Sequence, residues 1–83
     1  MNKIIINVYV PASGNKYEMR IPSSSQMFKI LELIKKAVND SEDGKYRSDD
    51  SAVLCDKNTG NIINLNLTAE EIGIQNGSNL MLI

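Results

Sequence analysis

Apolar and polar side chains alternate in two runs near the start of the chain. Between Lys3 and Val10 the even positions are apolar, and in residues 17–21 the odd positions are apolar. A period of two is typical of a half-buried β-strand. Residues 11–15 between the runs include a proline and a glycine, which favour a turn. The pattern predicts an N-terminal β-hairpin with these inward side chains: Ile4, Ile6, Val8, Val10, Tyr17, Met19 and Ile21.

The next apolar residues have the spacing of a helix. A stripe wide enough to cover one face of a sheet is formed by Met27, Ile30, Leu31, Ile34, Ala37 and Val38. On the polar side, Glu32 precedes Lys36 by one turn, which is the favourable order for an ion pair. At the helix start, Ser23 with Gln26 fits a capping box, whereas Ser25 is the cap if the helix begins later. The sequence leaves both caps open.

Shorter elements follow the helix. After a polar, acidic loop at 39–50, the pattern predicts a strand at 51–56, a hairpin turn at 57–60, a strand at 62–65, a helical turn at 69–72 and a strand at 80–83. The order ββαββ(short helix)β predicts an α+β fold in which one helix packs on one face of a mixed sheet. We find no linker or internal repeat, so we expect a single domain spanning residues 1–83.

Composition narrows the classes of function. The chain has 83 residues with ordinary apolar and charged content, and its net charge of −1 comes from lysines and arginines scattered among acids. That balance gives no electrostatic reason to expect nucleic acid or an anionic membrane as partner. There is no histidine, so the commonest general base and the commonest metal ligand are both missing. This composition does not exclude an enzyme, but it makes enzymatic activity much less expected.

Two further observations bear on location. The single cysteine, Cys55, excludes an internal disulfide, which suits a reducing compartment. The apolar run after Lys3 is too short for a signal peptide or a membrane span. We expect a cytoplasmic protein.

Three segments invite a chemical interpretation. In the acidic loop, residues fall at ligand positions of an EF-hand-like site: Asn39, Ser41, Asp43, Gly44 and Asp50. The last ligand is the wrong residue type and a strand follows, so we prefer a solvated loop without a role in metal binding. Residues 56–61 suit a hairpin turn better than a cation site. Cys55 lacks a histidine partner, and we interpret it as a small buried hydrophobe.

The end of the chain resembles a known family. The sequence Gly73-Ile74-Gln75-Asn76-Gly77 follows a helical turn and leads into an apolar strand without a terminal Gly-Gly. With the element order, this resembles the ubiquitin-like β-grasp superfamily and, within it, the bacterial YukD/EsaB group encoded with the Firmicutes type VII (ESAT-like, WXG-motif) secretion system. The resemblance implies that the first and last strands are central and parallel.

The resemblance also implies a role. It indicates a non-enzymatic, non-conjugating accessory protein that binds or regulates secretion components, including a membrane ATPase. It also implies that the protein has no substrate and no cofactor. Two alternatives are a ubiquitin-like interaction domain of unrelated cellular role and a sulfur carrier or protein modifier. The latter needs a Gly-Gly end, which the strand at 80–83 does not lead into.

A binding face follows from strand parity. If Ile4, Ile6, Leu80 and Leu82 face the helix, then Ile5, Met81 and Ile83 face away from it. Ubiquitin-like domains bind partners through an apolar patch on this open sheet face, and contiguous exposed apolar area usually marks an interface. We expect a protein-binding face, with self-association into a weak homodimer and the absence of any role as alternatives.

The third predicted strand leaves its orientation open. Leu54 joins the binding face only if Val53 and Cys55 point inward, and the reverse orientation buries Leu54. Asp56 shares the parity of Leu54, which favours an outward Leu54 because a carboxylate prefers water. The predicted binding residues are therefore Ile5, Leu54, Met81 and Ile83.

Overall fold

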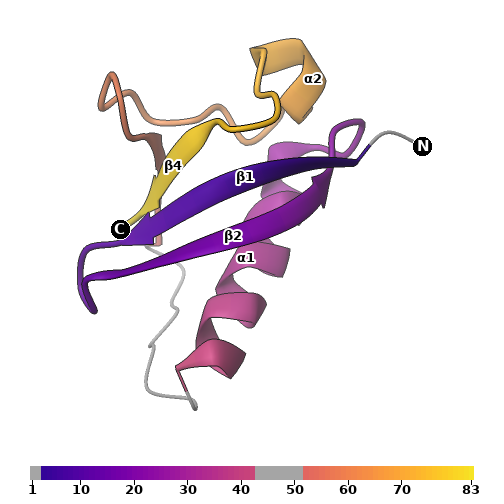
Figure 1. Cartoon of the computed structure of the whole chain (residues 1–83). Helices are drawn as coiled ribbons and strands as arrows, with labels where there is room; N and C mark the ends of the chain where they lie inside the picture. Colours follow the sequence, from indigo (N-terminus) through magenta and orange to yellow (C-terminus); the bar gives the residue numbers. More distant parts are fainter. Residues whose placement is uncertain (1–2, 43–51) are drawn as a thin grey trace.

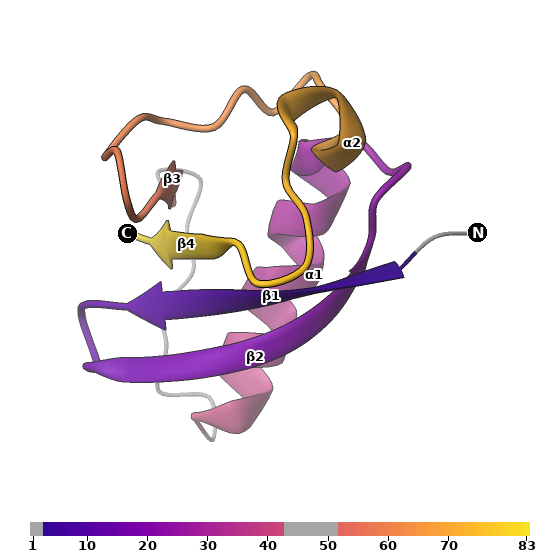
Figure 2. The same ribbon diagram turned by 45° about the horizontal axis from the view of Figure 1, so that its top comes forward.

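A four-stranded sheet with one long helix across one of its faces forms the body of the molecule (Figure 1). The computed structural model describes residues 3–42 and 52–83. Its elements are β1 (Lys3–Val10), β2 (Asn15–Pro22), α1 (Met27–Ser41), β3 (Leu54–Asp56), α2 (Ala69–Ile72) and β4 (Asn79–Leu82). The strand order is β2-β1-β4-β3, and α1 lies behind the sheet in both ribbon views (Figure 2). Within residues 3–42 and 52–83, no helix lies on the other face of the sheet.

The first and last strands are neighbours in the middle of the sheet. β1 and β2 form the predicted antiparallel hairpin, whose register runs from Lys3 opposite Pro22 to Val10 opposite Asn15. β1 pairs with β4 in parallel, and β4 pairs with β3 antiparallel. This is the central parallel pair that the family resemblance implies. A parallel pair needs a long crossover connection, and here everything between the hairpin and β4 provides it.

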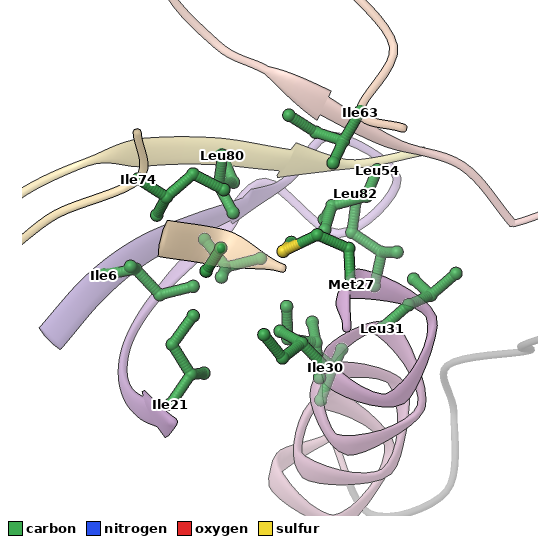
Figure 3. Close-up of a cluster of buried hydrophobic side chains, with 14 of the residues drawn as sticks. Ile6, Ile21, Met27, Ile30, Leu31, Leu54, Ile63, Ile74, Leu80 and Leu82 are labelled. Atoms are coloured by element: carbon green, nitrogen blue, oxygen red, sulfur yellow. The ribbon is translucent and has the colours of Figure 1, made fainter. Parts of the chain in front are cut away.

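The core lies between α1 and the sheet. The even positions Ile6, Val8 and Val10 of β1 are fully buried, as are Leu80 and Leu82 of β4. They meet the helix stripe formed by Met27, Ile30, Leu31, Ile34 and Val38 (Figure 3). Ile4, near the end of the sheet, is only partly buried. The predicted inward faces of the first and last strands are therefore confirmed.

The start of α1 differs from both predicted caps. Gln26 is the N-cap, and its side chain makes no capping hydrogen bond. Instead, the Met27 N–H donates to the Leu67 carbonyl at 2.8 Å and the Phe28 N–H donates to the Leu65 carbonyl at 3.0 Å. The first turn of a helix always has unpaired N–H groups, and here a distant backbone segment accepts from two of them. No local sequence motif announces such a cap.

The same backbone segment explains a missing strand. Residues 62–65 do not form the predicted fourth strand, and only an isolated bridge joins Ile62 to Cys55. Since the carbonyls of residues 65 and 67 accept from the helix, this segment turns away from the sheet edge after Ile63. The third strand is also shorter than predicted, at Leu54–Asp56, while Ser51 lies outside the described residues. In α1, Glu32 pairs with Lys35 at 3.0 Å, not with Lys36.

The Gly-Ile-Gln-Asn-Gly segment pins β4 beside β1. The Asn76 side chain accepts a hydrogen bond from the Ile5 N–H at 2.8 Å, and the Gly77 N–H donates to the Ile5 carbonyl at 2.8 Å. Gly73 and Gly77 both have positive φ, at 93° and 87°, a backbone conformation that glycine adopts without strain. The segment therefore closes α2 and holds the chain next to β1 where the last strand begins.

Candidate protein-binding face

The sheet face turned away from α1 collects the odd positions of β1, and we call it the open face. Antiparallel partners lie on the same face, so β2 adds the residues opposite those positions. β4 adds Asn79 and Met81, which pair with Asn7 and Tyr9, and β3 adds Cys55, which pairs with Met81. Its side chains come from Lys3, Ile5, Asn7, Tyr9, Lys16, Glu18, Arg20, Asn79, Met81 and Cys55.

The apolar part of the open face has two separate ends. Tyr9 is directly beside Met81, and Ile83 continues the strand direction with 61% of its surface exposed. Ile5 is 38% exposed but lies four residues back along β1, roughly 13 Å from Tyr9. Between them the Asn7 side chain donates to the Asn79 side chain at 3.2 Å. The structure thus brings Met81 and Ile83 together and sets Ile5 apart from them.

Leu54 does not belong to this face. It is 1% exposed and lies opposite Leu82, with which it packs in the core on the helix side (Figure 3). The parity argument from Asp56 was wrong, because the Asp56 carboxylate has local partners. It accepts from the backbone N–H groups of Asn58 at 2.8 Å and Thr59 at 3.3 Å, so it needs no outward position.

Val53 and Cys55 take the open-face positions of this strand. Val53 exchanges two backbone hydrogen bonds with Ile83, at 3.0 and 2.8 Å, and is partly buried. Cys55 lies opposite Met81 and is 4% exposed, so the interpretation of a buried cysteine is confirmed.

Two residues that sequence reasoning missed complete the site. The Lys57 ammonium lies 4.8 Å from the centre of the Tyr9 ring, within the range of a cation–π contact. A depression of about 330 Å³ next to this pair is lined in part by Asn7, Lys16 and Glu18. The odd position of Tyr9 in the first alternating run was a usable signal. The contact with Lys57 could not be predicted from the sequence, because it depends on β1 and β3 lying on either side of β4.

The sequence also raised two possible cation sites, one in the turn after β3 and one in the EF-hand-like pattern. Within the turn after β3, the Asp56 carboxylate binds backbone N–H groups and Gly60 has a φ of 79°, which confirms the turn interpretation. Asp43, Gly44 and Asp50 of the EF-hand-like pattern lie outside the described residues. In residues 3–42 and 52–83, no three His, Cys, Asp or Glu side chains are grouped closely enough to hold a metal ion.

None of the helices in the described part of the chain is both long enough and apolar enough to span a bilayer.

Tyr17 and Glu42 share a polar contact on the helix side of the sheet, and this contact shifts the pKa of each group. The Glu42 carboxylate at the end of α1 accepts hydrogen bonds from the Tyr17 hydroxyl at 2.5 Å and from the Ser13 hydroxyl at 2.9 Å. The bond from Tyr17 holds the pKa of Glu42 below its usual value, and the same bond raises the pKa of Tyr17. Because Tyr17 is paired with core residue Val8, this contact lies away from the open face. It ties the helix end to the hairpin.

Comparisons with known proteins establish the fold. No protein-family model matches the sequence, and no curated protein matches it. Among solved structures, the ubiquitin-like domain of EccD5 from Mycobacterium xenopi superposes with a TM-score of 0.82 at 16% identity, covering all of this chain and 94% of that one. The ubiquitin-like domain of the Mycobacterium tuberculosis type VII secretion protein ECCD1 gives 0.78 at 11% identity, with coverage of 100% and 99%.

A third similar structure is a chain of the ESX-5 inner membrane complex. Its TM-score is 0.81 at 15% identity, and the match covers all of this chain but 21% of that longer one. At these identities the likeness speaks to the fold. The chain therefore has the ubiquitin-like β-grasp fold, which the family resemblance implied, within the α+β class that the element order predicted.

Proposed function

We propose that this protein is a non-enzymatic ubiquitin-like adaptor of a type VII secretion system, which acts by non-covalent protein binding through its open face. The observation that carries the proposal is the apolar strip on the sheet face opposite α1, in which Tyr9 and Met81 are half-buried and Ile83 is exposed. Exposed apolar area of this kind costs solvation free energy in the isolated protein, and a partner that covers it removes that cost.

The residue types in the strip suit a binding surface. Met81 is flexible and polarisable, so it adapts to a partner's shape, while the Tyr9 ring offers a large apolar body with a polar tip. The adjacent Asn7–Asn79 pair supplies amide groups for hydrogen bonds at the strip's edge. A small apolar centre with a polar border is the usual anatomy of a protein–protein interface.

The secretion context rests on two independent resemblances. The Gly-Ile-Gln-Asn-Gly segment and apolar last strand resemble the YukD/EsaB group. The fold is shared with the ubiquitin-like domains of EccD5 and ECCD1 and with part of an ESX-5 inner membrane complex. We infer partners among secretion components, with a membrane ATPase as the first to test, and a cytoplasmic site of action that keeps Cys55 reduced.

The proposal is tested by titrating the purified protein with the soluble domains of the type VII ATPase from the same organism. We expect binding by the wild type, measured by calorimetry, and a loss of at least about tenfold in affinity for Ile83→Glu and for Met81→Glu, because a buried unpaired carboxylate is costly at an interface. Leu33→Glu is the matched control, since Leu33 is 52% exposed on α1, on the other side of the molecule. Circular dichroism verifies that each variant is folded.

The outcomes separate the parts of the proposal. If Ile83→Glu and Met81→Glu bind as the wild type does, the open face is not the binding site. If the wild type binds neither the ATPase nor other components of the system, the assignment to secretion is wrong and an interaction domain of another cellular role remains. Genes for WXG-motif proteins and a membrane ATPase beside this one are expected under the proposal.

A further inference from the structure

Charged side chains are divided unevenly between the two sides of the molecule. On the open face lie four cations, Lys3, Lys16, Arg20 and Lys57, and one carboxylate, Glu18. Elsewhere in the described residues, three lysines accompany six carboxylates, which are Glu32, Asp40, Glu42, Asp56, Glu70 and Glu71. A chain of net charge −1 thus carries a positive face.

The cations border both apolar ends of that face. At one end, Lys16 lies opposite Tyr9 on β2, while Lys57 lies over the Tyr9 ring from the β3 side. At the other end, Arg20 lies opposite Ile5, and Lys3 is two residues from Ile5 on the same face. The arrangement follows from the register, because Arg20 and Lys16 of β2 lie directly opposite the outward Ile5 and Tyr9 of β1.

These cations have no ion-pair partner within the part of the chain that the structure describes. The ion pair found there joins Glu32 to Lys35 on α1, on the opposite side of the molecule. Unpaired cations on one face of a protein give that face a positive potential, which attracts a partner of opposite charge. Since the cations border the apolar residues, one partner surface can contact the cations and the apolar residues at the same time.

We propose that the open face selects a protein partner whose docking surface carries carboxylates around an apolar centre. This rests on the proposed function, because it specifies the partner chemistry of the same face. The apolar side chains between the cations favour a protein over nucleic acid, whose backbone offers charge without an apolar centre. Exposed charge pairs contribute mainly to association rate and to rejection of wrong partners.

Two synthetic peptides of equal length provide the first test. Both carry the same apolar centre, flanked by glutamates in one and by lysines in the other, and each is titrated into isotope-labelled protein while amide chemical shifts are recorded. We expect the glutamate peptide to bind at least about tenfold more tightly, with shifts centred on Tyr9 and Met81. Raising NaCl from about 0.05 M to about 0.5 M weakens that binding several-fold. Equal affinities, shifts centred on α1, or no binding of either peptide overturn the proposal.

Charge variants keep this proposal separable from the proposed function. Lys16→Gln with Lys57→Gln is expected to weaken glutamate-peptide binding by about three- to tenfold, whereas the control Lys29→Gln with Lys36→Gln on α1 leaves it unchanged. If Ile83→Glu abolishes ATPase binding while the Lys16 and Lys57 variant retains it, the proposed function stands and the acidic partner is excluded. If the charge variant weakens peptide binding but no secretion component binds, the acidic partner stands and the assignment to type VII secretion is wrong.

Two other occupants of the face are tested directly. Vesicles of phosphatidylglycerol and phosphatidylcholine in equal parts are expected to retain no more protein than pure phosphatidylcholine vesicles do. Sedimentation is expected to give a monomer, although the acidic Glu70 and Glu71 offer a complementary surface on a second copy. Selective retention on the anionic vesicles, or a dimer that Lys16→Gln with Lys57→Gln dissociates, overturns the proposal.

Discussion

Ile34 and Leu33 are adjacent residues in α1 with opposite surroundings. Ile34 is 0% exposed and packs among the core side chains, whereas Leu33 is 52% exposed. Helical geometry turns successive residues by about 100°, so one faces the sheet and its neighbour faces water. The predicted stripe placed both residues correctly, because a stripe depends on spacing alone.

The first prediction compares these two side chains. Ile34→Ala is expected to lower the free energy of unfolding by about 2–5 kcal/mol, because it leaves a cavity that the packed core cannot fill. Leu33→Ala is expected to cost less than about 1 kcal/mol, since most of its side chain already meets water. Urea unfolding followed by circular dichroism measures both. Equal losses for the two variants would contradict the helix orientation.

The second prediction concerns the contact between Tyr17 and Glu42. Because the folded-state pKa of Glu42 is lowered, its contribution to stability is complete above its unfolded value of 4.5 and is lost as pH falls through the folded value. Tyr17→Phe removes the main cause of that shift. We expect the variant to be less stable than the wild type near neutral pH, and the difference to shrink on acidification.

Urea midpoints measured at about pH 7 and about pH 3 reveal this change. Tyr9→Phe is the control, because Tyr9 lies on the open face and has no carboxylate partner in the described residues. A stability difference between Tyr17→Phe and wild type that stays constant over this range would exclude the Glu42 contact as its source.

At the scale of elements, the two helices begin in different ways. α2 has a local capping box, in which the Glu71 N–H donates to the Thr68 hydroxyl at 3.0 Å and the Glu71 carboxylate accepts from the Thr68 N–H at 2.9 Å. α1 depends on carbonyls of the segment before α2. In return, the Glu70 N–H donates to the Ser23 carbonyl at 2.9 Å. The two helix starts are therefore mutually supporting.

The third prediction follows from that support. Glu71→Ala removes half of the capping box and is expected to destabilise the protein by about 1 kcal/mol. Glu70→Ala is the matched control, because its side chain is exposed in the same turn and takes no part in the box. We also expect amide exchange to quicken at Met27 and Phe28 in Glu71→Ala, since their acceptors precede α2. Unchanged exchange there would show that the two helix starts are independent.

At the scale of the whole molecule, the sheet joins the two ends of the sequence. β4 lies between β1 and β3, so its removal would leave the hairpin and β3 without a common neighbour. Cys55 reports on this arrangement, because it lies opposite Met81 and is almost fully buried. It is the only cysteine in the chain, so its labelling is free of competing signals.

The fourth prediction uses that thiol. A water-soluble disulfide reagent is expected to label Cys55 at least about 100-fold more slowly in the native protein than in the urea-unfolded chain, because the thiol must first become exposed. Kinetics at increasing urea concentration show whether exposure needs global unfolding or only release of the three-residue β3. Native labelling as fast as in the unfolded chain would mean that β3 does not pack as described.

Elements whose signals are local could be predicted from the amino-acid sequence. Alternation identified β1 and β2, helical spacing identified α1, and the motif around Gly73 identified α2 and the turn into the last strand. Inward positions in the long elements followed as well, since a strand or helix of many residues repeats its facing pattern several times. The open-face position of Ile5 followed from this repeat in β1, and those of Met81 and Ile83 followed from their alternation with the apolar Leu80 and Leu82.

Features that depend on neighbours distant in sequence emerged from the folded structure. A three-residue strand repeats too little to fix its orientation, so Leu54 was assigned to the wrong face. The cap of α1 and the loss of the strand at 62–65 come from one backbone segment that no local pattern identifies. Likewise, charges that look scattered along the chain share the open face. Register places Arg20 opposite Ile5 and Lys16 opposite Tyr9, and Lys57 reaches the Tyr9 ring from the turn after β3. Charge acts through space, and sequence order does not record distance in space.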